Sequence, residues 1–407
     1  ENYTHEHYSI IVLKRIVLAH NLEGKMRPDD FSSNSPGEVK KIVGPSFTYW
    51  AFVPNPLPPK LIYDNDLLFL LGEANRAMGE FSGFLSGSPG SRLLIRPLFR
   101  REAVASSQIE GTTSDIEDLY FFEADQNSVP LAEDVREVSN YLKALEYGLE
   151  RLKSLPISTR LFKELHSVLM SGVRGGYSYP GELRRTQNWI GKPGCTLNEA
   201  DYVPPPPEEL NDCLGELENF INSESRLPPL VRLALVHYQF EAIHPFVDGN
   251  GRVGRLLISL LKTYWGLMDQ PGLYLSGYFE ANRQEYYSRL RSVSFEGDWN
   301  GWIFFFLKAV LQQSELGKNK LKEIMDLRSN WIGRLKPVSS PLPLALIDSL
   351  FENPVITIPQ AAERLNVTYV SARRAITALC EKGVLSQTDQ SKYGKKYIAS
   401  ELIEIVK

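Results

Sequence analysis

The chain is 407 residues long, which is too long for one ordinary hydrophobic core and suits two or three domains. Hydrophobic residues make up 43% and charged residues 23%, as in ordinary globular proteins, and a formal charge of -4 excludes a global attraction to nucleic acid or anionic membranes. No apolar run reaches the roughly 18 residues of a membrane span, and the three cysteines form no disulfide or zinc pattern, so we expect a cytoplasmic protein without membrane contact.

The N-terminal region begins without helical periodicity. Residues 1–25 precede the first methionine and are either native or an upstream extension. The N-terminal region is expected to span 26–130, and its early part, rich in Gly, Pro and aromatic residues, holds a predicted strand at 47–53. Apolar residues at three- and four-residue steps then predict a helix from Asp66 onward, and a shorter helix is predicted at 103–110.

Residues 131–335 are predicted to form a helical core. Apolar residues recur with helical spacing at 131–153, 158–170, 207–222, 229–241, 251–265, 282–293 and 302–329. Between 183 and 203 this pattern gives way to a short alternating stretch, which predicts a β-hairpin. The expected fold class is therefore mainly α with a β-hairpin.

A change of composition after the helical core indicates a second unit. Residues 336–343 are a predicted linker, and 344–407 have a helical rhythm of their own. A helix at 358–365, a turn at Asn366, a second helix and a hairpin follow in the order of a small winged helix-turn-helix domain. Such domains bind DNA or dock and dimerise proteins; from 337 to 407 eight Lys and Arg against seven Asp and Glu leave a net +1, which supports DNA binding only weakly.

The segment His244-Pro-Phe-Val-Asp-Gly-Asn-Gly-Arg-Val-Gly-Arg255 combines features that suit a phosphate site. Gly249, Asn250 and Gly251 allow tight backbone turns and the close approach of a ligand. They precede a helix with apolar periodicity, whose first-turn N–H groups favour an anion.

Charged side chains of the same segment extend this prediction. Arg252 and Arg255 are three residues apart, so we expect them on one helical face, where two guanidinium groups suit a di- or triphosphate. Asp248 offers a hard oxygen ligand for Mg²⁺, and His244 has an ordinary pKa close enough to neutrality for a general base. Each feature alone is more often structural, but together they predict phosphoryl or nucleotidyl transfer.

This segment resembles the HPFxxGNGRxxR signature of the Fic family and matches it at every fixed position. Stretches at 180–191, 202–207, 240–241 and 275–290 are also similar to the family, so the resemblance extends from about residue 47 to about residue 307. It implies a Fic helical core whose β-hairpin is a flap that docks a target protein.

The resemblance implies protein AMPylation, the transfer of AMP from ATP to a protein hydroxyl. His244 would deprotonate a Tyr, Ser or Thr side chain of the target, which would attack the α-phosphate and expel pyrophosphate. Asp248 would hold Mg²⁺, and the backbone at 249–251 would donate to the phosphates. Arg252 and Arg255 would bind the β- and γ-phosphates.

The resemblance also implies contacts outside this segment. The flap between Lys192 and Asp201 would hold the target protein by adding a strand to its edge. Tyr286 and Tyr287 fall where the family often lines the adenine pocket, although aromatic pairs at helical spacing are more often core. A second copy of the chain is a further candidate partner.

The segment Ser106-Ser-Gln-Ile-Glu-Gly111 resembles the inhibitory motif of the family, [S/T]xxxE[G/N]. Ser106 and Glu110 are four residues apart and therefore share a helical face. If Glu110 pairs with Arg255, the γ-phosphate loses its cation and ATP binds in an unproductive orientation. The alternative is that Glu110 is only a carboxylate at a helix end.

Other functions remain compatible with the sequence. The chain could be a DNA-binding regulator with a nucleotide-sensing core, a transferase of another group such as UMP or phosphocholine, or a remover of AMP in which Glu110 positions a water. His166 and His237 lie in helices with strong apolar faces, so we predict that both are hydrogen-bonded core histidines rather than catalysts.

Overall fold

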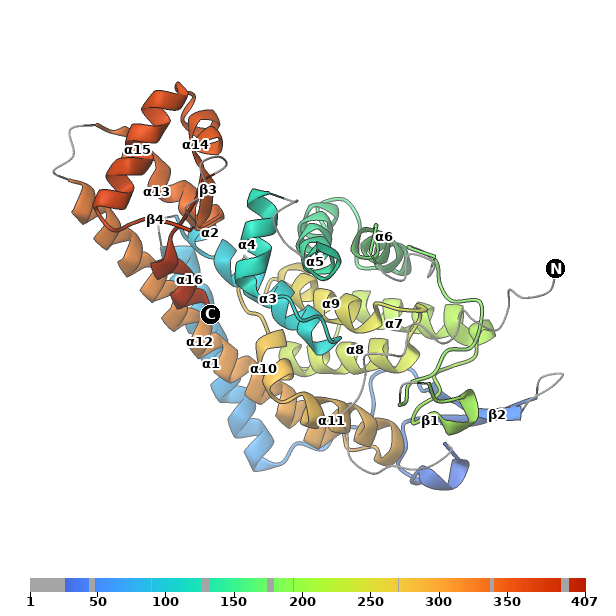
Figure 1. Ribbon diagram of the computed structural model, residues 1–407. Helices are drawn as coiled ribbons and strands as arrows, with labels where there is room; N and C mark the ends of the chain where they lie inside the picture. The colour runs from blue at the N-terminus through green and yellow to red at the C-terminus, as the bar shows by residue number, and fades with distance from the viewer. Residues whose placement is uncertain are drawn as a thin grey trace, which may run out of the picture.

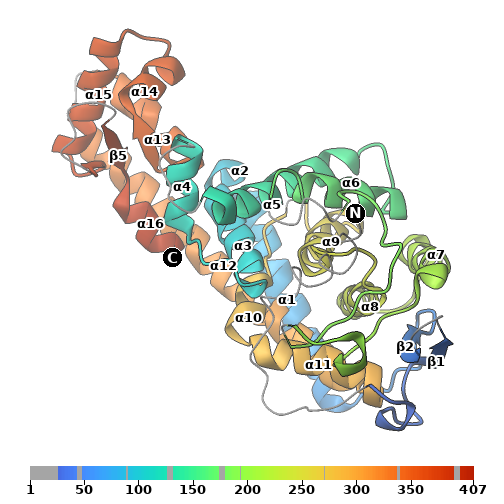
Figure 2. The ribbon, with the colours of Figure 1, turned by 45° about the vertical axis from the view of Figure 1, so that its right-hand side comes forward.

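The computed structural model describes residues 26–43, 48–88, 90–125, 132–173, 179–192, 194–269, 271–336, 340–388 and 395–407. The segment 1–25, predicted to be native or an upstream extension, lies outside the described residues. Figures 1 and 2 show a largely helical molecule with its C-terminal unit, coloured orange to red, at one end. The prediction of a mainly α fold is confirmed.

An antiparallel pair of strands precedes the helices. Strand β1, Gly37–Val43, pairs with β2, Thr48–Pro54, in a register that sets Val39 opposite Phe52. β2 is the strand predicted in this region. Its Phe52 N–H donates to the Val203 carbonyl at 2.9 Å, so the pair supports the segment predicted to be the flap.

Helices α1 to α12 follow in the described part of the chain. They are α1 Asn65–Gly87, α2 Ser91–Leu94, α3 Arg96–Ile109, α4 Ile116–Ala124, α5 Ala132–Arg151, α6 Thr159–Leu169, α7 Leu210–Asn222, α8 Pro229–Ile243, α9 Asn250–Tyr264, α10 Ser276–Ala281, α11 Arg283–Glu296 and α12 Trp299–Leu335. Every helix predicted from periodicity is present. Helix α12 extends beyond the predicted 302–329 at both ends, and Asp298 caps its earlier start by accepting from the Gly301 N–H at 2.9 Å.

Helices α8 and α9 are the buried centre of the core (Figure 1). Helix α9 contacts α3, α5, α6 and α8, and α8 contacts α7, α11 and α12. The loop that joins α8 to α9 therefore starts and ends in rigid, enclosed helices.

The long helix α12 runs parallel to α1 and links the core to the C-terminal unit. Asn300 donates to Asp64 near the start of both helices at 3.5 Å, and Lys318 pairs with Glu80 further along at 2.9 Å. Trp302, Phe305 and Phe306 are buried against the core. Across the described ranges, no helix has both the length and the apolar character to cross a membrane.

The C-terminal unit combines helices with a small sheet. Its elements are α13 Leu342–Glu352, β3 Val355–Thr357, α14 Ile358–Leu365, α15 Tyr369–Glu381, β4 Ser386–Gln387, β5 Lys396–Ile398 and α16 Ser400–Val406, with the strands in the antiparallel order β3-β5-β4. Asn366 is left-handed (φ 51) between α14 and α15, and the Thr368 side chain caps α15. The predicted helix, turn and helix are therefore present, whereas the identity of a winged helix-turn-helix domain stays a prediction.

This unit packs directly on the preceding helices. Trp331 of α12 donates to Glu401 at 2.6 Å, and Asn353 donates to the Tyr120 carbonyl of α4 at 3.2 Å. Its apolar residues belong to the same buried cluster as those of the helical core. The predicted domain boundaries, including the linker at 336–343, stay predictions.

Candidate active site

The loop between α8 and α9 is held by its own side chains. Helix α8 ends at His244, whose backbone is left-handed (φ 50), and α9 begins after Gly249, where a φ of 78 favours glycine. The Asn250 side chain accepts from the Phe246 N–H at 2.8 Å and donates to the Phe246 carbonyl at 2.8 Å. Asn250 therefore closes the loop with its side chain, in addition to the backbone role predicted for it.

His166 of α6 ties this loop to the segment that follows α6. Its Nδ1 accepts from the Gly181 N–H at 2.9 Å, so its Nε2 carries the proton and donates to the Asp248 carbonyl at 3.0 Å. Burial lowers the pKa of His166 to about 4, which keeps the ring neutral. The prediction that His166 is a hydrogen-bonded core histidine is confirmed.

His244 presents a neutral imidazole at the start of the loop. Burial and, second, the nearby Arg184 cation lower the pKa of His244 to about 4, so the ring can accept a proton at neutral pH. Its Nδ1 lies 3.3 Å from the Glu241 carbonyl, which favours the proton on Nδ1 and leaves Nε2 as the basic nitrogen. The His244 carbonyl accepts from Arg184 at 2.9 Å and from Asn188 at 3.4 Å, which fixes the backbone behind the ring.

Arg255 lies against the helix that carries the predicted inhibitory motif. Its Nη2 contacts Glu110 Oε1 at 2.7 Å, while Nε donates to Ser106 Oγ and Nη2 to the Ser106 carbonyl, both at 2.9 Å. The Arg255 side chain is 1% exposed and that of Glu110 is 23% exposed. Burial opposes the charge on Glu110, but Arg255 outweighs it and lowers the pKa of the carboxyl, so the contact is an ion pair.

Glu110 sits directly on the first turn of α9. A Cβ atom at position 251 would collide with Glu110 Oε1 and lie 2.8 Å from Arg255 Nη1, so the close approach requires Gly251. The anion expected at this helix N-terminus is, in this conformation, a carboxylate of the chain itself.

The guanidinium groups of Arg252 and Arg255 turn to different carboxylates, and their predicted binding of the phosphates stays a prediction. Arg252 turns toward α5, where its Nη1 contacts Glu137 at 3.1 Å, and its side chain is 4% exposed. The Cβ atoms of residues three apart on a helix are close together, but each long arginine side chain extends toward the carboxylate with which its guanidinium group pairs. Arg255 turns instead toward α3.

Asp248 is the residue predicted to hold Mg²⁺. Its side chain is 32% exposed, and its Oδ1 accepts from the Gly249 N–H at 2.7 Å and lies 3.8 Å from Arg252. No group of three or more His, Cys, Asp and Glu side chains in the described ranges could hold a metal. A partly exposed carboxylate beside the predicted phosphate site fits Mg²⁺, which commonly combines one or two carboxylates with phosphate oxygens and water.

Tyr286, predicted to line the adenine pocket, is buried among core side chains in this structure, and its role at the adenine stays a prediction. It is 1% exposed, and His237 Nε2 lies 2.8 Å from its hydroxyl, with Phe279 stacked at a centroid distance of 4.7 Å. Burial lowers the pKa of His237 to about 3, so His237 is a neutral core histidine, as predicted. Tyr287 is half-buried, and its predicted place at the adenine stays a prediction.

The predicted flap is not a regular hairpin. Its described residues contain one antiparallel bridge, between Ile190 and Tyr202, and a 3-10 turn at Leu197–Glu199. Tyr202-Val-Pro-Pro-Pro-Pro207 explains the short pairing, because proline has no N–H to extend a ladder. The prediction of a β-hairpin here is therefore only partly right.

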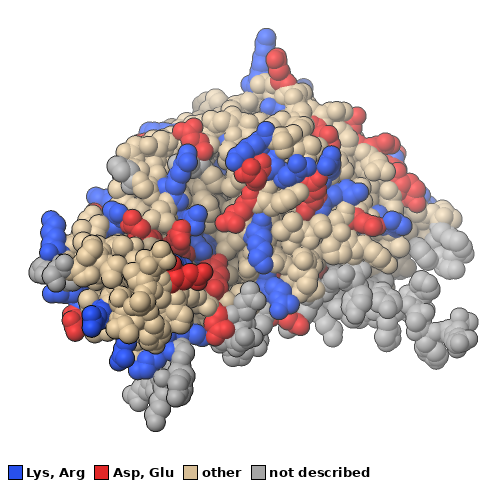
Figure 3. All heavy atoms as spheres, turned by 90° about the horizontal axis from the view of Figure 1, so that it is seen from above, with Lys and Arg blue, Asp and Glu red and all other residues tan. Residues whose placement is uncertain are grey.

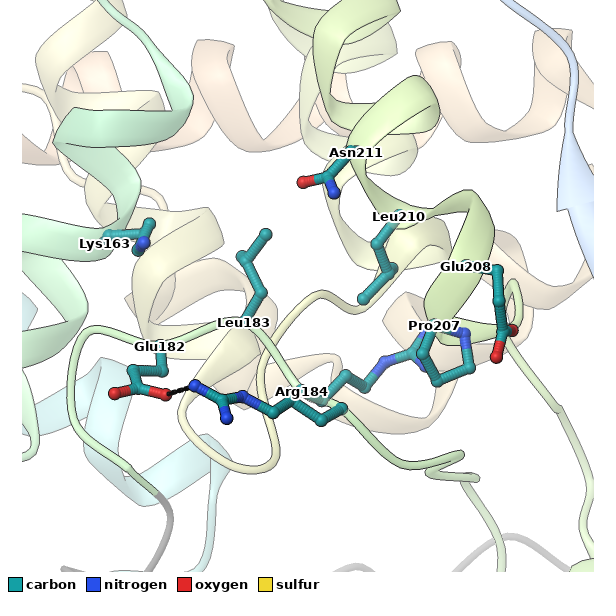
Figure 4. Close-up of a pocket in the computed structure, with 9 residues that line it drawn as sticks. Lys163, Glu182, Leu183, Arg184, Pro207, Glu208, Leu210 and Asn211 are labelled. Carbon is teal, nitrogen blue, oxygen red and sulfur yellow. Dashed lines mark hydrogen bonds and ion pairs between the residues drawn. The ribbon is translucent and has the colours of Figure 1, made fainter.

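A hollow of about 570 Å³ lies beside the root of this flap (Figure 4). Lys163, Glu182, Glu208 and Asn211 are among the residues around it, and Arg185 pairs with Glu182 at 2.8 Å. The hollow mixes charges of both signs and does not include the loop between α8 and α9. It is therefore distinct from the predicted phosphate site.

The described surface is electrostatically mixed on the face seen in Figure 3, where Lys and Arg side chains are interspersed with Asp and Glu. This agrees with the expectation of no global attraction to a polyanion. The free cysteines are Cys195, Cys213 and Cys380, as predicted.

Three charged residues shape the site although none was predicted individually as a site residue. Glu137 pairs with Arg252, and Arg184 holds the carbonyl of His244. Burial raises the pKa of the Glu241 carboxyl to about 8, and its Oε1 is buried without a hydrogen-bond partner in the described structure. The sequence signals for Glu241 are its place in the family-like stretch 240–241 and its position on the apolar α8, three residues before His244.

Comparisons with known proteins identify the same regions. The model described as Fic/DOC family N-terminal matches residues 68–150, and that described as Fic/DOC family matches 156–261, which includes the loop. The chain is 33% identical over 156 residues to protein adenylyltransferase Fic of Drosophila grimshawi, covering 38% of this chain and 29% of that protein. It is 32% identical over 130 residues to protein adenylyltransferase fic-1 of Caenorhabditis briggsae, covering 31% and 22%. The chain thus spans less than a third of these curated relatives.

Solved structures agree at the level of the fold. A Fic family protein from Desulfovibrio desulfuricans superposes with a TM-score of 0.53 at 20% identity, covering 84% of this chain and 98% of that one. A Fic domain containing signaling protein from Bacteroides thetaiotaomicron gives a TM-score of 0.50 at 20% identity, with 62% and 97% covered. Together with the loop signature, the two matched models lead to one conclusion: the chain carries a Fic/DOC family N-terminal region at 68–150 and a Fic/DOC family region at 156–261.

Proposed function

We propose that the protein transfers AMP from ATP to a hydroxyl side chain of a target protein. One observation supports this proposal most directly. The Glu110 carboxylate lies on the first turn of α9, where its Oε1 contacts Nη2 of the buried Arg255 at 2.7 Å. A site that binds a carboxylate with a helix N-terminus and a guanidinium group suits a terminal phosphate equally well. The relatives named protein adenylyltransferase supply the choice of ATP.

In the proposed reaction, Nε2 of His244 takes the proton from the target hydroxyl. The hydroxyl oxygen forms a bond to the α-phosphorus of ATP, and the bond from that phosphorus to the bridging oxygen breaks, so pyrophosphate leaves. Burial keeps the ring neutral, and the contact of Nδ1 with the Glu241 carbonyl favours the tautomer whose Nε2 is basic, which is the form that this step requires. A positioned general base contributes about 10²–10⁴-fold in rate.

The phosphates would be held by the loop and by Arg255. First-turn N–H groups of α9 point along the helix axis toward a bound anion. Asp248 would hold Mg²⁺, which supplies positive charge to the phosphate oxygens when it is bound. Arg252 would have to leave Glu137 to take part.

Glu110 would act as a built-in inhibitor of this reaction. The terminal phosphate of ATP and the Glu110 carboxylate compete for Arg255 and for the same helix N-terminus. Holding about 99% of molecules inactive requires ~2.7 kcal/mol, which a well-formed and largely buried ion pair can supply.

The target protein would dock at the flap between Lys192 and Asp201. The single bridge from Ile190 to Tyr202 leaves this segment little regular pairing of its own, and an added target strand would extend it. The docking contact is thus expected to use backbone hydrogen bonds more than particular side chains.

Removal of AMP from a modified protein is the second candidate function. Only Oε1 of Glu110 is in the contact with Arg255, and the side chain is 23% exposed, so Oε2 could orient a water toward the phosphorus. This reaction needs Glu110 as a participant, whereas AMP transfer needs it removed from the site. Transfer of a different nucleotide remains a variant of the first proposal.

The experiment that tests the proposal uses ATP labelled at the α-phosphorus and a cell lysate as the source of targets. Incubation with the purified chain should label protein, and His244→Ala should abolish the label. Equal labelling by both forms would exclude His244 as the base. Release of AMP from pre-modified protein would favour the second candidate function. Preferential incorporation of label from another nucleotide would show that this nucleotide, and not ATP, is the donor.

A further inference from the structure

One buried carboxylate of α5 contacts both the inhibitory segment and the loop helix. Oε2 of Glu137 accepts from Arg252 Nη1 at 3.1 Å and from Thr112 Oγ1 at 3.4 Å. The three residues are nearly enclosed, with exposed fractions of 6% for Glu137, 4% for Thr112 and 3% for Arg252. Since Thr112 follows Glu110 by two residues, a single oxygen atom connects the end of α3 to the start of α9.

A second carboxylate fixes the same turn. Asp134, one helical turn before Glu137, accepts from the Thr113 hydroxyl at 3.2 Å and from its N–H at 3.4 Å. Gly111 makes the turn possible with a φ of 94. The segment after Glu110 is therefore held on α5, while Glu110 itself is held on α9.

Arg252 has hydrogen-bonding capacity that this conformation leaves unused. Its Nε is buried and has no partner in the described structure, and its Nη2 is near only weak or distant partners, the Met170 sulfur at 3.7 Å and Asp248 at 3.8 Å. A guanidinium group offers five donors, and buried donors are usually satisfied. This arrangement fits a side chain that takes a second anion when one enters the loop.

We propose that Glu137 is a positioning residue that couples nucleotide binding at Arg252 to release of the inhibitory segment. The inference rests on the proposed function, because it assumes that Glu110 inhibits the transfer. A phosphate that draws Arg252 away breaks the ion pair on the Glu137 oxygen that also accepts from Thr112, so the carboxylate can reorient. The hydrogen bond from Thr112 to Glu137 must then change, so the segment that holds Glu110 on α9 is anchored less firmly. Because such coupling is reciprocal, weakening the contact between Thr112 and Glu137 must in turn favour the nucleotide-bound state.

The test changes Thr112, which lies outside the proposed catalytic and phosphate-binding residues. Thr112→Val keeps the shape and removes the hydroxyl, and Thr112→Ser keeps the hydroxyl as a matched control. In the full chain, Thr112→Val should raise the rate of AMP transfer from α-labelled ATP by about fivefold, as expected for the loss of one hydrogen bond. Thr112→Ser should keep the rate of the unmodified chain.

The same substitutions in a Glu110→Gly background isolate the coupling. There, Thr112→Val should add nothing, because no inhibitory carboxylate remains to be released. An unchanged rate for Thr112→Val alone, or an equal gain in both backgrounds, would overturn the coupling while leaving AMP transfer intact. Absence of transfer by Glu110→Gly itself would instead refute the proposed function.

Hydrogen exchange gives a second readout that does not depend on turnover. Adding ATP with Mg²⁺ should speed amide exchange at residues 106–114 in the unmodified chain, because the turn loses part of its anchor. Glu137→Gln, which removes the carboxylate that pairs with Arg252, should abolish most of this ATP-dependent increase. An ATP effect of the same size in Glu137→Gln would overturn the assigned role of Glu137.

Discussion

Replacing Glu110 by Gly removes the carboxylate that occupies the first turn of α9, and this change should activate the protein. Loss of one member of a buried ion pair commonly costs about 3–5 kcal/mol. Here the Glu110 side chain is 23% exposed, and Arg255 keeps its two bonds to Ser106, so a smaller value applies. We take ~2.7 kcal/mol, which corresponds to an increase of about 100-fold in AMP transfer.

The assay measures incorporation of label from α-labelled ATP into protein at fixed enzyme concentration. A matched control is Glu123→Gln, because Glu123 pairs with Arg100 of the same helix α3 at 3.0 Å, and that pair does not involve the loop. The control should keep the unmodified rate. A gain of similar size in both variants would mean that loosening α3 is sufficient, and no gain for Glu110→Gly would refute the competition for Arg255.

Further predictions concern the loop and its pH dependence. His244→Ala should lower the transfer rate of the activated chain by about 10²–10⁴-fold in a labelling time course. Because the pKa of His244 is lowered to about 4, that rate should hold through the neutral range and fall only as the pH drops toward about 4; a fall centred near 6.5 would contradict the burial of the ring. Asn250→Ala removes both bonds to Phe246 and should lower the free energy of unfolding by about 1–3 kcal/mol in a denaturant titration, whereas an unchanged midpoint would contradict the closure of the loop. Burial raises the pKa of Glu241 to about 8 in the folded chain. The free energy of unfolding should therefore fall as the pH rises from the ordinary carboxyl pKa to about 8. The Glu241→Gln chain lacks this loss, so its free energy of unfolding should increase relative to that of the unmodified chain over the same pH interval. If the free energies of unfolding of the two chains change with pH in parallel, the raised pKa is excluded.

The parts of this structure that follow from local sequence were predictable. Apolar spacing located the helices of the core, and the run from His244 to Arg255 indicated a loop that ends at a helix N-terminus. Glu110 and Arg255 are 145 residues apart, so their contact could not be deduced from spacing. It followed only from the family resemblance of the inhibitory motif.

The side-chain directions that spacing did not predict depend on distant residues. Arg252 was expected beside Arg255, but Glu137, 115 residues earlier, holds its guanidinium group on α5. Tyr286 was predicted to line the adenine pocket, and in this structure His237 and neighbouring rings enclose it. Neither partner is visible to a pattern within one helix, because tertiary packing sets the direction of a long or aromatic side chain.

The most direct test of the account asks which phosphorus of ATP reaches the target. Purified Glu110→Gly chain is incubated with a protein substrate and ATP labelled at either the α- or the γ-phosphorus, and the modified hydroxyl is identified by mass spectrometry. The account predicts that the α-label enters the protein as AMP while the γ-label leaves as pyrophosphate in equal amount. Retention of the γ-label on the protein, with release of ADP, would contradict it.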